Sequence, residues 1–230
     1  MTGKMFPWIN ETWNPVKGCL HNCRYCWARS LAEGKLKNTP RYRDGFRPRL
    51  NPEELGKRFG KGASVFVSDM GDLFGEWVPG EWISKVLNCI KRSPEAEFLL
   101  LTKNPIRFLE FRGEIPGNCV FGATIETNRH YDGVSRAPDW RERWMAMEKL
   151  GEDPHRKFIS IEPIMDFDTE EILSHVKAIK PCMVAVGYDN YSNRLPEPSL
   201  EKVEWLIGEL ETAGIKVVRK TIRPPNGVRA

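Results

Sequence analysis

The feature that most constrains this chain is a run of three cysteines near its N-terminus. Cys19, Cys23 and Cys26 follow the pattern C-x3-C-x2-C, and Tyr25 stands directly before the third cysteine. A loop that leads into a helix can bring all three sulfurs around one metal centre. Cysteines rarely cluster this tightly for packing alone, so the run indicates a metal site.

The donor set favours an iron–sulfur cluster over zinc. A [4Fe–4S] cluster normally takes four cysteine ligands. Three ligands leave one iron with an open position, as three protein ligands do on a catalytic zinc. A structural zinc usually takes further ligands from a second pair along the chain, but His21 is the only other nearby candidate in the sequence. Zinc and three inert, buried thiols are the alternatives.

The motif resembles the cluster-binding motif of the radical S-adenosylmethionine (SAM) superfamily. The resemblance implies that Cys19, Cys23 and Cys26 hold a [4Fe–4S] cluster, that SAM chelates its open iron, and that Tyr25 lies against the adenine. In that family, reductive cleavage of SAM gives methionine and a 5′-deoxyadenosyl radical, which takes a hydrogen atom from the substrate. The implied partners are SAM and a cytosolic electron donor.

Length and composition fit one soluble domain that spans residues 1–230. The chain is 40% hydrophobic and 29% charged, which is typical of a protein with one sizeable core. No apolar run approaches the roughly 18 residues of a membrane span, and the first residues lack the apolar region of a signal peptide. Cysteine use favours a reducing compartment over a disulfide scaffold. We therefore expect a cytoplasmic protein without a membrane segment.

Short apolar runs recur along the chain and predict buried strands. A first short strand is expected at residues 12–13, and later runs begin near Val65, Phe98, Cys119, Lys157, Cys182 and Lys216. These runs are near-continuous rather than alternating, as in strands that are buried on both faces. Cys119 and Cys182 begin two of the runs, and we expect both, together with Cys89, to be small core residues.

Amphipathic helical patterns separate most of these strands. We expect a helix over roughly residues 25–36, a second opened by Pro79, a third begun by a capping box of Asp168 and Glu171, and a fourth capped by Ser199. The strand–helix repeat predicts an α/β fold with a parallel sheet. Seven strands are too few for a closed eight-fold barrel. A doubly wound sheet is the alternative, and the radical SAM resemblance implies a partial (β/α)6 TIM-like barrel.

Polar residues follow five of the predicted strands. They are Ser68, Asp69 and Asp72, then Thr102 and Lys103, then Thr124 and Glu126, then Ser160 and Glu162, and finally Asp189 and Asn190. Any single one is more often a turn or cap residue, but the carboxyl ends of parallel strands meet at one edge, where chemistry gathers. Carboxylates and hydroxyls suit the ribose and sulfonium of SAM. Thr124, Glu126, Ser160 and Glu162 are therefore SAM candidates, and Lys103 is a candidate partner for a carboxylate.

The segments TWNPVKGC, SDMGDLF, LLTKNP, FGATIET and FISIEP occur in this order within residues 12–163. Together they resemble an uncharacterised, often phage-associated family of radical-SAM-like proteins. The resemblance implies site roles for Asp72, Thr102, Lys103, Glu126 and Glu162. Residues 68–71 stand where many radical SAM enzymes have a Gly-Gly-Glu run that contacts SAM, and here the sequence departs from that run. Ser68 is one of the cofactor-binding candidates. Asp69 and Asp72 are candidates for a catalytic role.

An irregular, basic segment follows the cysteine loop. Within residues 29–61 the basic residues are Arg29, Lys35, Lys37, Arg41, Arg43, Arg47, Arg49, Lys57, Arg58 and Lys61. Tyr42 and Phe46 interleave with them, in the part (37–64) that is rich in proline and glycine. Basic side chains with aromatics can follow a nucleic-acid backbone and stack bases, which makes a nucleotide or nucleic acid a candidate substrate. A solvated surface loop is the alternative.

Three functions are consistent with these patterns. The first is a radical SAM enzyme whose substrate is unidentified. The second is a nucleic-acid-binding protein with a structural metal site and no radical chemistry. The third is a protein that keeps the cluster as an interaction or redox unit without turnover.

Overall fold

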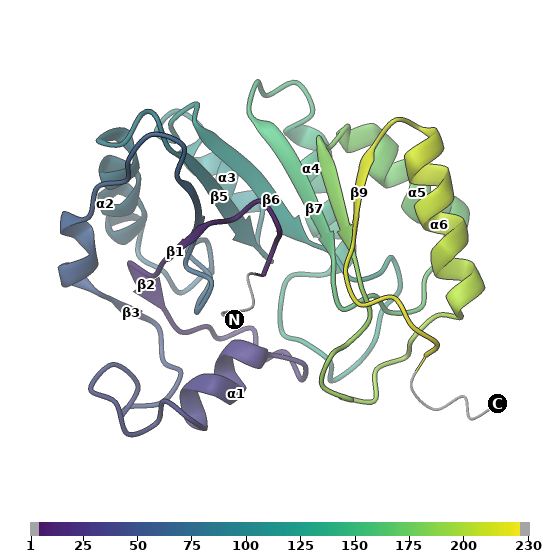
Figure 1. The fold of residues 1–230 in the computed structure, drawn as a ribbon, viewed down its shortest axis with the longest axis horizontal. Helices are drawn as coiled ribbons and strands as arrows, with labels where there is room; N and C mark the ends of the chain where they lie inside the picture. The colour runs from purple at the N-terminus through teal and green to yellow at the C-terminus, as the bar shows by residue number, and fades with distance from the viewer. Residues whose placement is uncertain (1–4, 226–230) are drawn as a thin grey trace.

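The computed structural model describes residues 5–225, which fold around a seven-stranded parallel sheet (Figure 1). The strands are β1 (Glu11–Trp13), β4 (Ser64–Val67), β5 (Glu97–Thr102), β6 (Cys119–Thr124), β7 (Arg156–Ile161), β8 (Met183–Val186) and β9 (Lys216–Arg219). Their order in the sheet follows the chain without a reversal, whereas a doubly wound sheet reverses its order. Within the described residues β1 and β9 stay unpaired with each other, so the fold is the predicted open, partial TIM-like barrel.

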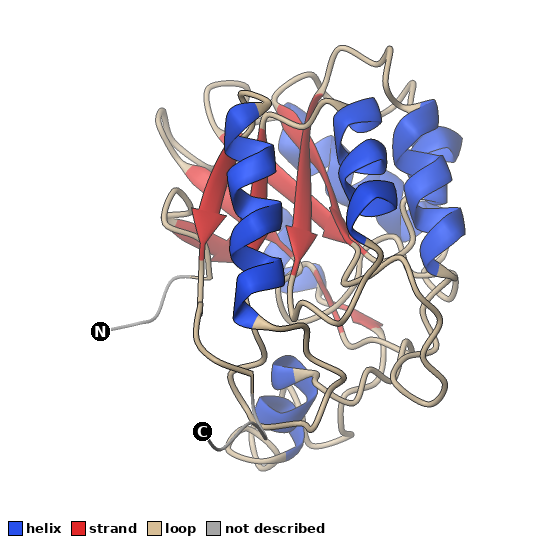
Figure 2. Ribbon diagram, turned by 90° about the vertical axis from the view of Figure 1, so that its right-hand side faces the viewer, coloured by secondary structure: helices blue, strands red, loops and turns tan. Residues whose placement is uncertain are grey.

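Helices cover one face of this sheet (Figure 2). They are α2 (Gly80–Lys91), α3 (Ile106–Phe111), α4 (Trp140–Lys149), α5 (Thr169–Ile179) and α6 (Leu200–Thr212). Helix α1 (Trp27–Glu33) instead lies below the sheet in Figure 1. A small antiparallel pair, β2 (Val16–Lys17) with β3 (Arg49–Leu50), and a 3-10 turn at Pro52–Gly56 complete the region around α1.

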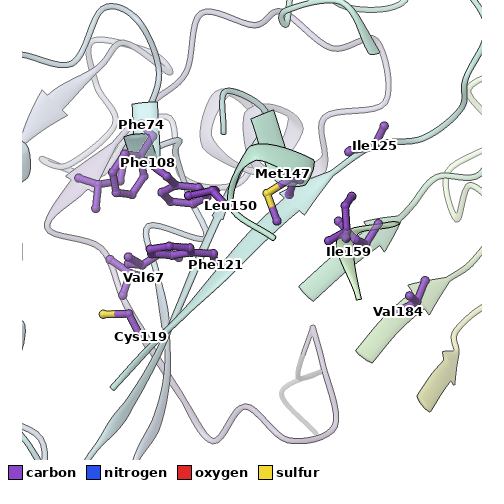
Figure 3. Packing of buried hydrophobic residues seen from close by; sticks show 14 of the residues in the cluster. Val67, Phe74, Phe108, Cys119, Phe121, Ile125, Met147, Leu150, Ile159 and Val184 are labelled. Atoms are coloured by element: carbon purple, nitrogen blue, oxygen red, sulfur yellow. The ribbon is translucent and has the colours of Figure 1, made fainter. Parts of the chain in front are cut away.

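The main core lies between the sheet and the helices. Phe108 of α3 stacks on Phe121 of β6 with ring centroids 4.7 Å apart, and Figure 3 shows this pair beside Leu150. Trp144 of α4 is fully buried in the same layer. Since the other residues of each strand point to the opposite face, this core leaves the concave side of the sheet free.

A second core fills part of that concave side. Phe6, which precedes β1, packs its ring 5.0 Å from Phe158 and 5.9 Å from Phe66. Phe6 is almost fully buried, and burial of a phenylalanine contributes about 1.5–3 kcal/mol. The N-terminal segment is therefore packed inside the concave side of the sheet, where Phe6 and Phe66 also line a cavity at the carboxyl ends of the strands.

One predicted helix start and one predicted helix cap differ from the structure. The helix after the cysteines begins at Trp27 rather than Tyr25, because the Cys26 sulfur accepts the Arg29 amide at 3.3 Å and caps it. The predicted capping box at α5 is wrong: the Asp168 side chain makes no cap hydrogen bond. Asn128 takes that role, since its side chain accepts the Asp168 amide at 2.8 Å and donates to Glu171 at 2.7 Å.

Of the other predictions about helix caps and core cysteines, some are confirmed and one is wrong. Ser199 caps α6 as predicted, accepting the Lys202 amide at 3.2 Å. Cys89 and Cys119 are buried, but Cys182 is exposed, because β8 begins one residue later, at Met183. Among residues 5–225 no helix is long and apolar enough to cross a membrane.

Candidate active site

A cavity of about 790 Å³ lies on the concave side of the sheet, at the carboxyl ends of the strands. From the cysteine loop and its neighbours it is lined by Cys19, Cys23, Tyr25, Cys26, Asp69 and Asp72. From the ends of β5, β6 and β7 it is lined by Thr102, Lys103, Thr124, Ser160 and Glu162. The structure thus brings together most of the predicted site residues, although they come from five separate parts of the sequence.

Two predicted site residues do not line the cavity. Ser68 is buried, and its backbone amide donates to the Trp13 carbonyl at 2.7 Å. Its φ of 58° places it in a turn after β4, so its role is to shape the chain. Glu126 is also buried, directly behind Tyr25 and Lys103, both of which line the cavity.

The cysteine loop is shaped by a close backbone contact. Gly18 has a φ of +78°, and a Cβ there would lie 2.1 Å from the Arg47 carbonyl oxygen. Only glycine allows this approach, which sets the path of the chain into Cys19. Burial raises the pKa of the Cys19 thiol and of the Cys26 thiol. Because a metal ligand is a thiolate, a bound cation would offset this cost of ionisation.

Asp72 anchors the cysteine loop to the sheet. Its carboxylate lies 2.9 Å from His21 Nε2 and accepts the Thr102 hydroxyl at 2.6 Å and the Lys103 amide at 3.0 Å. Burial alone would raise its pKa, but the hydrogen bonds and the His21 charge hold it below the usual range. The carboxylate is fully engaged, which favours a positioning role over proton transfer.

Glu126 sits at the centre of a buried ion network. One carboxylate oxygen contacts both the Tyr25 hydroxyl and the Lys103 ammonium, and the other accepts Arg143 Nη1 at 2.7 Å. Burial would raise the pKa of Glu126, but Arg143 and Lys103 hold it well below its usual range. Glu126 is therefore ionised and committed, and it fixes the two cavity residues that it contacts.

Glu162 at the end of β7 is placed differently. Its carboxyl group accepts the Ser160 hydroxyl at 3.2 Å, and Lys220 Nζ lies 4.0 Å away. Burial raises the pKa of Glu162, and the distant Lys220 offsets this only in part. Gly187 makes the room for this arrangement, since a Cβ there would lie 2.7 Å from Lys220 Cβ. Glu162 therefore faces the cavity with hydrogen-bonding capacity left over.

Asp189, after β8, forms a turn. It accepts the Tyr191 amide at 3.2 Å and the Asn193 side-chain amide at 2.8 Å. Beside it, Tyr191 is 65% exposed and lines the mouth of the cavity. Asp189 thus has both a turn role and a place at the site, since Asp189 and Asn190 line the cavity together with Tyr191.

Three residues around the site carry no local signal in the sequence. Arg143 reaches Glu126 from α4, Lys220 follows β9, and Ser135 Oγ lies 3.1 Å from Cys23 Sγ. Each approaches from a segment distant in the chain. Arg143 is in an otherwise ordinary charged helix, so only the tertiary structure identifies it.

Three cysteines are the residues that could hold a metal centre here. Cys19, Cys23 and Cys26 all line the cavity, whereas His21 is engaged by Asp72. Within residues 5–225 no three His, Cys, Asp or Glu side chains gather closely enough to hold one metal ion.

Comparison with known proteins places the chain in a family. A family model described as "Protein of unknown function (DUF5131)" matches residues 4–213. The chain belongs to the DUF5131 family. No curated protein matches it.

Solved structures share the fold of this DUF5131 chain. A spore photoproduct lyase variant with bound AdoMet and dinucleoside spore photoproduct has a TM-score of 0.58 at 11% identity, over 86% of this chain and 60% of its own. A radical SAM methyltransferase from Sphaerobacter thermophilus has 0.62 at 14%, over 94% and 67%. Streptococcus suis SuiB bound to S-adenosylmethionine has 0.57 at 10%, over 92% and 50%. The chain thus spans about 60% of the lyase's length, and the likeness is one of fold.

Proposed function

We propose that this protein is a radical SAM enzyme in which Cys19, Cys23 and Cys26 hold a [4Fe–4S] cluster. The observation that carries the proposal is the position of the three cysteines, which line one cavity at the carboxyl ends of the strands. The fold, shared with radical SAM enzymes, supports it. When bound, the cluster supplies the electron that cleaves SAM to methionine and a 5′-deoxyadenosyl radical, which takes a hydrogen atom from the substrate.

The cavity offers SAM two kinds of contact. Thr124, Ser160 and Glu162 present hydroxyls and a carboxyl group from adjacent strands, which suit ribose hydroxyls and a sulfonium cation. Lys103 presents an ammonium group near Tyr25, 5.1 Å from the centre of its ring, which supports it as the partner of the SAM carboxylate. Glu126 acts on SAM through these two residues, because its own oxygens are taken.

We infer a nucleotide or nucleic acid as the substrate class. The fold neighbour with a bound dinucleoside supports this class, as do the exposed basic side chains of residues 29–61, which include Arg43, Arg47 and Lys61. The predicted aromatic partners are wrong, however. Tyr42 and Phe46 are buried, so base stacking falls to Tyr191 at the cavity mouth.

The test is anaerobic reconstitution with iron and sulfide, followed by reduction with dithionite in the presence of SAM. We expect a brown protein that forms 5′-deoxyadenosine. Cys23→Ala should lose both the colour and the product, whereas the exposed Cys182→Ser should keep both. A protein that binds only zinc, or that holds a cluster without cleaving SAM under any reductant, would contradict the proposal.

A further inference from the structure

A segment that follows β6 runs across the outside of the cysteine loop. Val134 accepts the Arg24 amide at 2.8 Å, and the Arg136 amide donates to the His21 carbonyl at 2.6 Å. Between these two contacts, Ser135 Oγ lies 3.1 Å from Cys23 Sγ. Three consecutive residues, 134–136, thus contact the loop that carries the cysteines, and we call them the strap.

The segment that leads into the strap is fixed to the body of the protein at residues 128 and 129. Arg129 pairs with the carboxylates of Asp166 and Asp168. Asn128 bonds Asp168 and Glu171. These contacts tie the beginning of the segment to the N-terminal end of α5. The strap therefore has a defined position from which a side chain can be aimed at the loop.

Two of the cysteine sulfurs in the loop have a hydrogen-bond partner among the described residues. Cys26 accepts the backbone amide of Arg29 at 3.3 Å, a donor that a side-chain substitution does not remove. Cys23 is instead met by a side chain, that of Ser135, which lies 112 positions away in the sequence.

The direction of the Ser135 hydrogen bond follows from its neighbours. Ser135 Oγ accepts the Ala137 amide at 3.0 Å, and its single hydrogen is left for Cys23 or, at 3.5 Å, for the His21 carbonyl. A metal-bound cysteine is a thiolate, which only accepts. The hydroxyl must then donate to Cys23, at the shorter of the two distances.

We propose that Ser135 is a positioning residue that donates a hydrogen bond to the Cys23 thiolate and raises the reduction potential of the cluster. The inference rests on the proposed function. Hydrogen bonds to the sulfurs of an iron–sulfur cluster tune its potential, because they stabilise the more negative, reduced state. One electron enters the cluster on reduction, and the strap makes that step easier.

The experiment is a redox titration of the reconstituted protein without SAM, with dithionite as reductant and the reduced cluster followed by electron paramagnetic resonance. In Ser135→Ala we expect the ratio of reduced to oxidised cluster at a fixed potential to fall about tenfold, which is about 59 mV for one electron. Ser135→Thr, which keeps the hydroxyl, should match the wild type. Ser30→Ala is the matched control, since that hydroxyl bonds the Cys26 carbonyl rather than its sulfur.

A second pair of variants controls for the possibility that Ser135→Ala changes the potential through poor packing rather than through the lost hydroxyl. Ser135→Thr and Ser135→Val have the same size and differ in one hydroxyl, so only the valine variant should show the more negative potential. The inference would be overturned, and the proposed function left intact, if Ser135→Ala had the same reduction potential as the wild type at wild-type iron content. The same holds if Ser135→Val had the same reduction potential as Ser135→Thr. Failure of the wild-type protein to take up a cluster would overturn both.

Discussion

Glu126 and Glu162 occupy equivalent places at the ends of neighbouring strands, yet the protein treats them in opposite ways. Glu126 is ionised and held by Arg143, Lys103 and Tyr25. Within the part of the chain that the structure describes, Glu162 is met by the Ser160 hydroxyl and by a lysine at 4.0 Å, and burial raises its pKa. The comparison teaches that position at a strand end does not define a role; the number of committed contacts does. On one side of the cavity, Glu126, Tyr25, Lys103 and Arg143 are held by their own contacts, and we call these four residues the frame. On the other side, Glu162 keeps hydrogen-bonding capacity for a ligand.

The largest expected effect follows from breaking the frame. In Glu126→Gln the charges of Arg143 and Lys103 lose their buried partner, and removal of one member of a buried pair costs about 3–5 kcal/mol. The free energy of unfolding in urea measures this loss. Glu162→Gln is the matched control from the other side of the cavity, and equal destabilisation by the two substitutions would contradict the comparison.

Lowering the pH should reduce the difference in unfolding free energy between the wild type and Glu126→Gln. The pKa of Glu126 is depressed in the folded protein below its usual value of 4.5. Its contribution to stability is therefore present above pH 4.5 and is lost as the pH falls toward the folded pKa. The gap in unfolding free energy between the wild type and Glu126→Gln should narrow when measured at successively lower pH below 4.5. A gap that stays constant there would show that the carboxylate charge is not what stabilises the frame.

A smaller effect is expected where the frame meets the cysteine loop. Asp72→Asn weakens the bond to His21, and a hydrogen bond to a charged group contributes about 1.5–3 kcal/mol. The loop should loosen, so amide hydrogen exchange in residues 19–26 should quicken. Asp69→Asn is the control, since that carboxylate bonds Asn14 rather than the loop. Unchanged amide hydrogen exchange in Asp72→Asn would contradict a positioning role for Asp72.

The smallest effect on stability is expected at Glu162. Its folded pKa is raised, so its contribution to stability is fully present below its usual 4.5 and is lost as the pH rises through the folded pKa. At neutral pH, Glu162→Gln should change the unfolding free energy by less than about 1 kcal/mol. SAM binding should weaken about tenfold, the size of one charged hydrogen bond, as equilibrium dialysis would show. A stability loss as large as that of Glu126→Gln, with unchanged SAM binding, would reverse the two roles.

Local patterns in the sequence predict the strands and the rim of the cavity well. The apolar runs near Val65, Phe98 and Cys119 all become strands of the sheet, because buried parallel strands need a continuous apolar run. The polar residues that follow them gather because parallel strands end at one edge. Thr102 and Ser160, far apart in the chain, thus line one cavity.

Contacts between distant segments are what the sequence does not predict. The Asp168 capping box fails because Asn128 reaches its helix from another loop. The sequence predicts that Tyr42, which lies among arginines, stacks on bases, but its side chain is buried in a core cluster with residues of α1. Arg143 and Ser135 become visible only when the fold brings them to Glu126 and Cys23.

The central claim is that three sulfurs hold a cluster beside a cavity whose Glu162 side receives SAM. A crystal structure of the reconstituted protein, grown with SAM without oxygen, tests it most directly. We predict one cysteine sulfur on each of three irons, the amino and carboxylate groups of SAM on the fourth, and the ribose toward Ser160 and Glu162, with the Glu126 contacts unchanged. A single ion held by the cysteines, or SAM bound directly to a displaced Glu126, would contradict the claim.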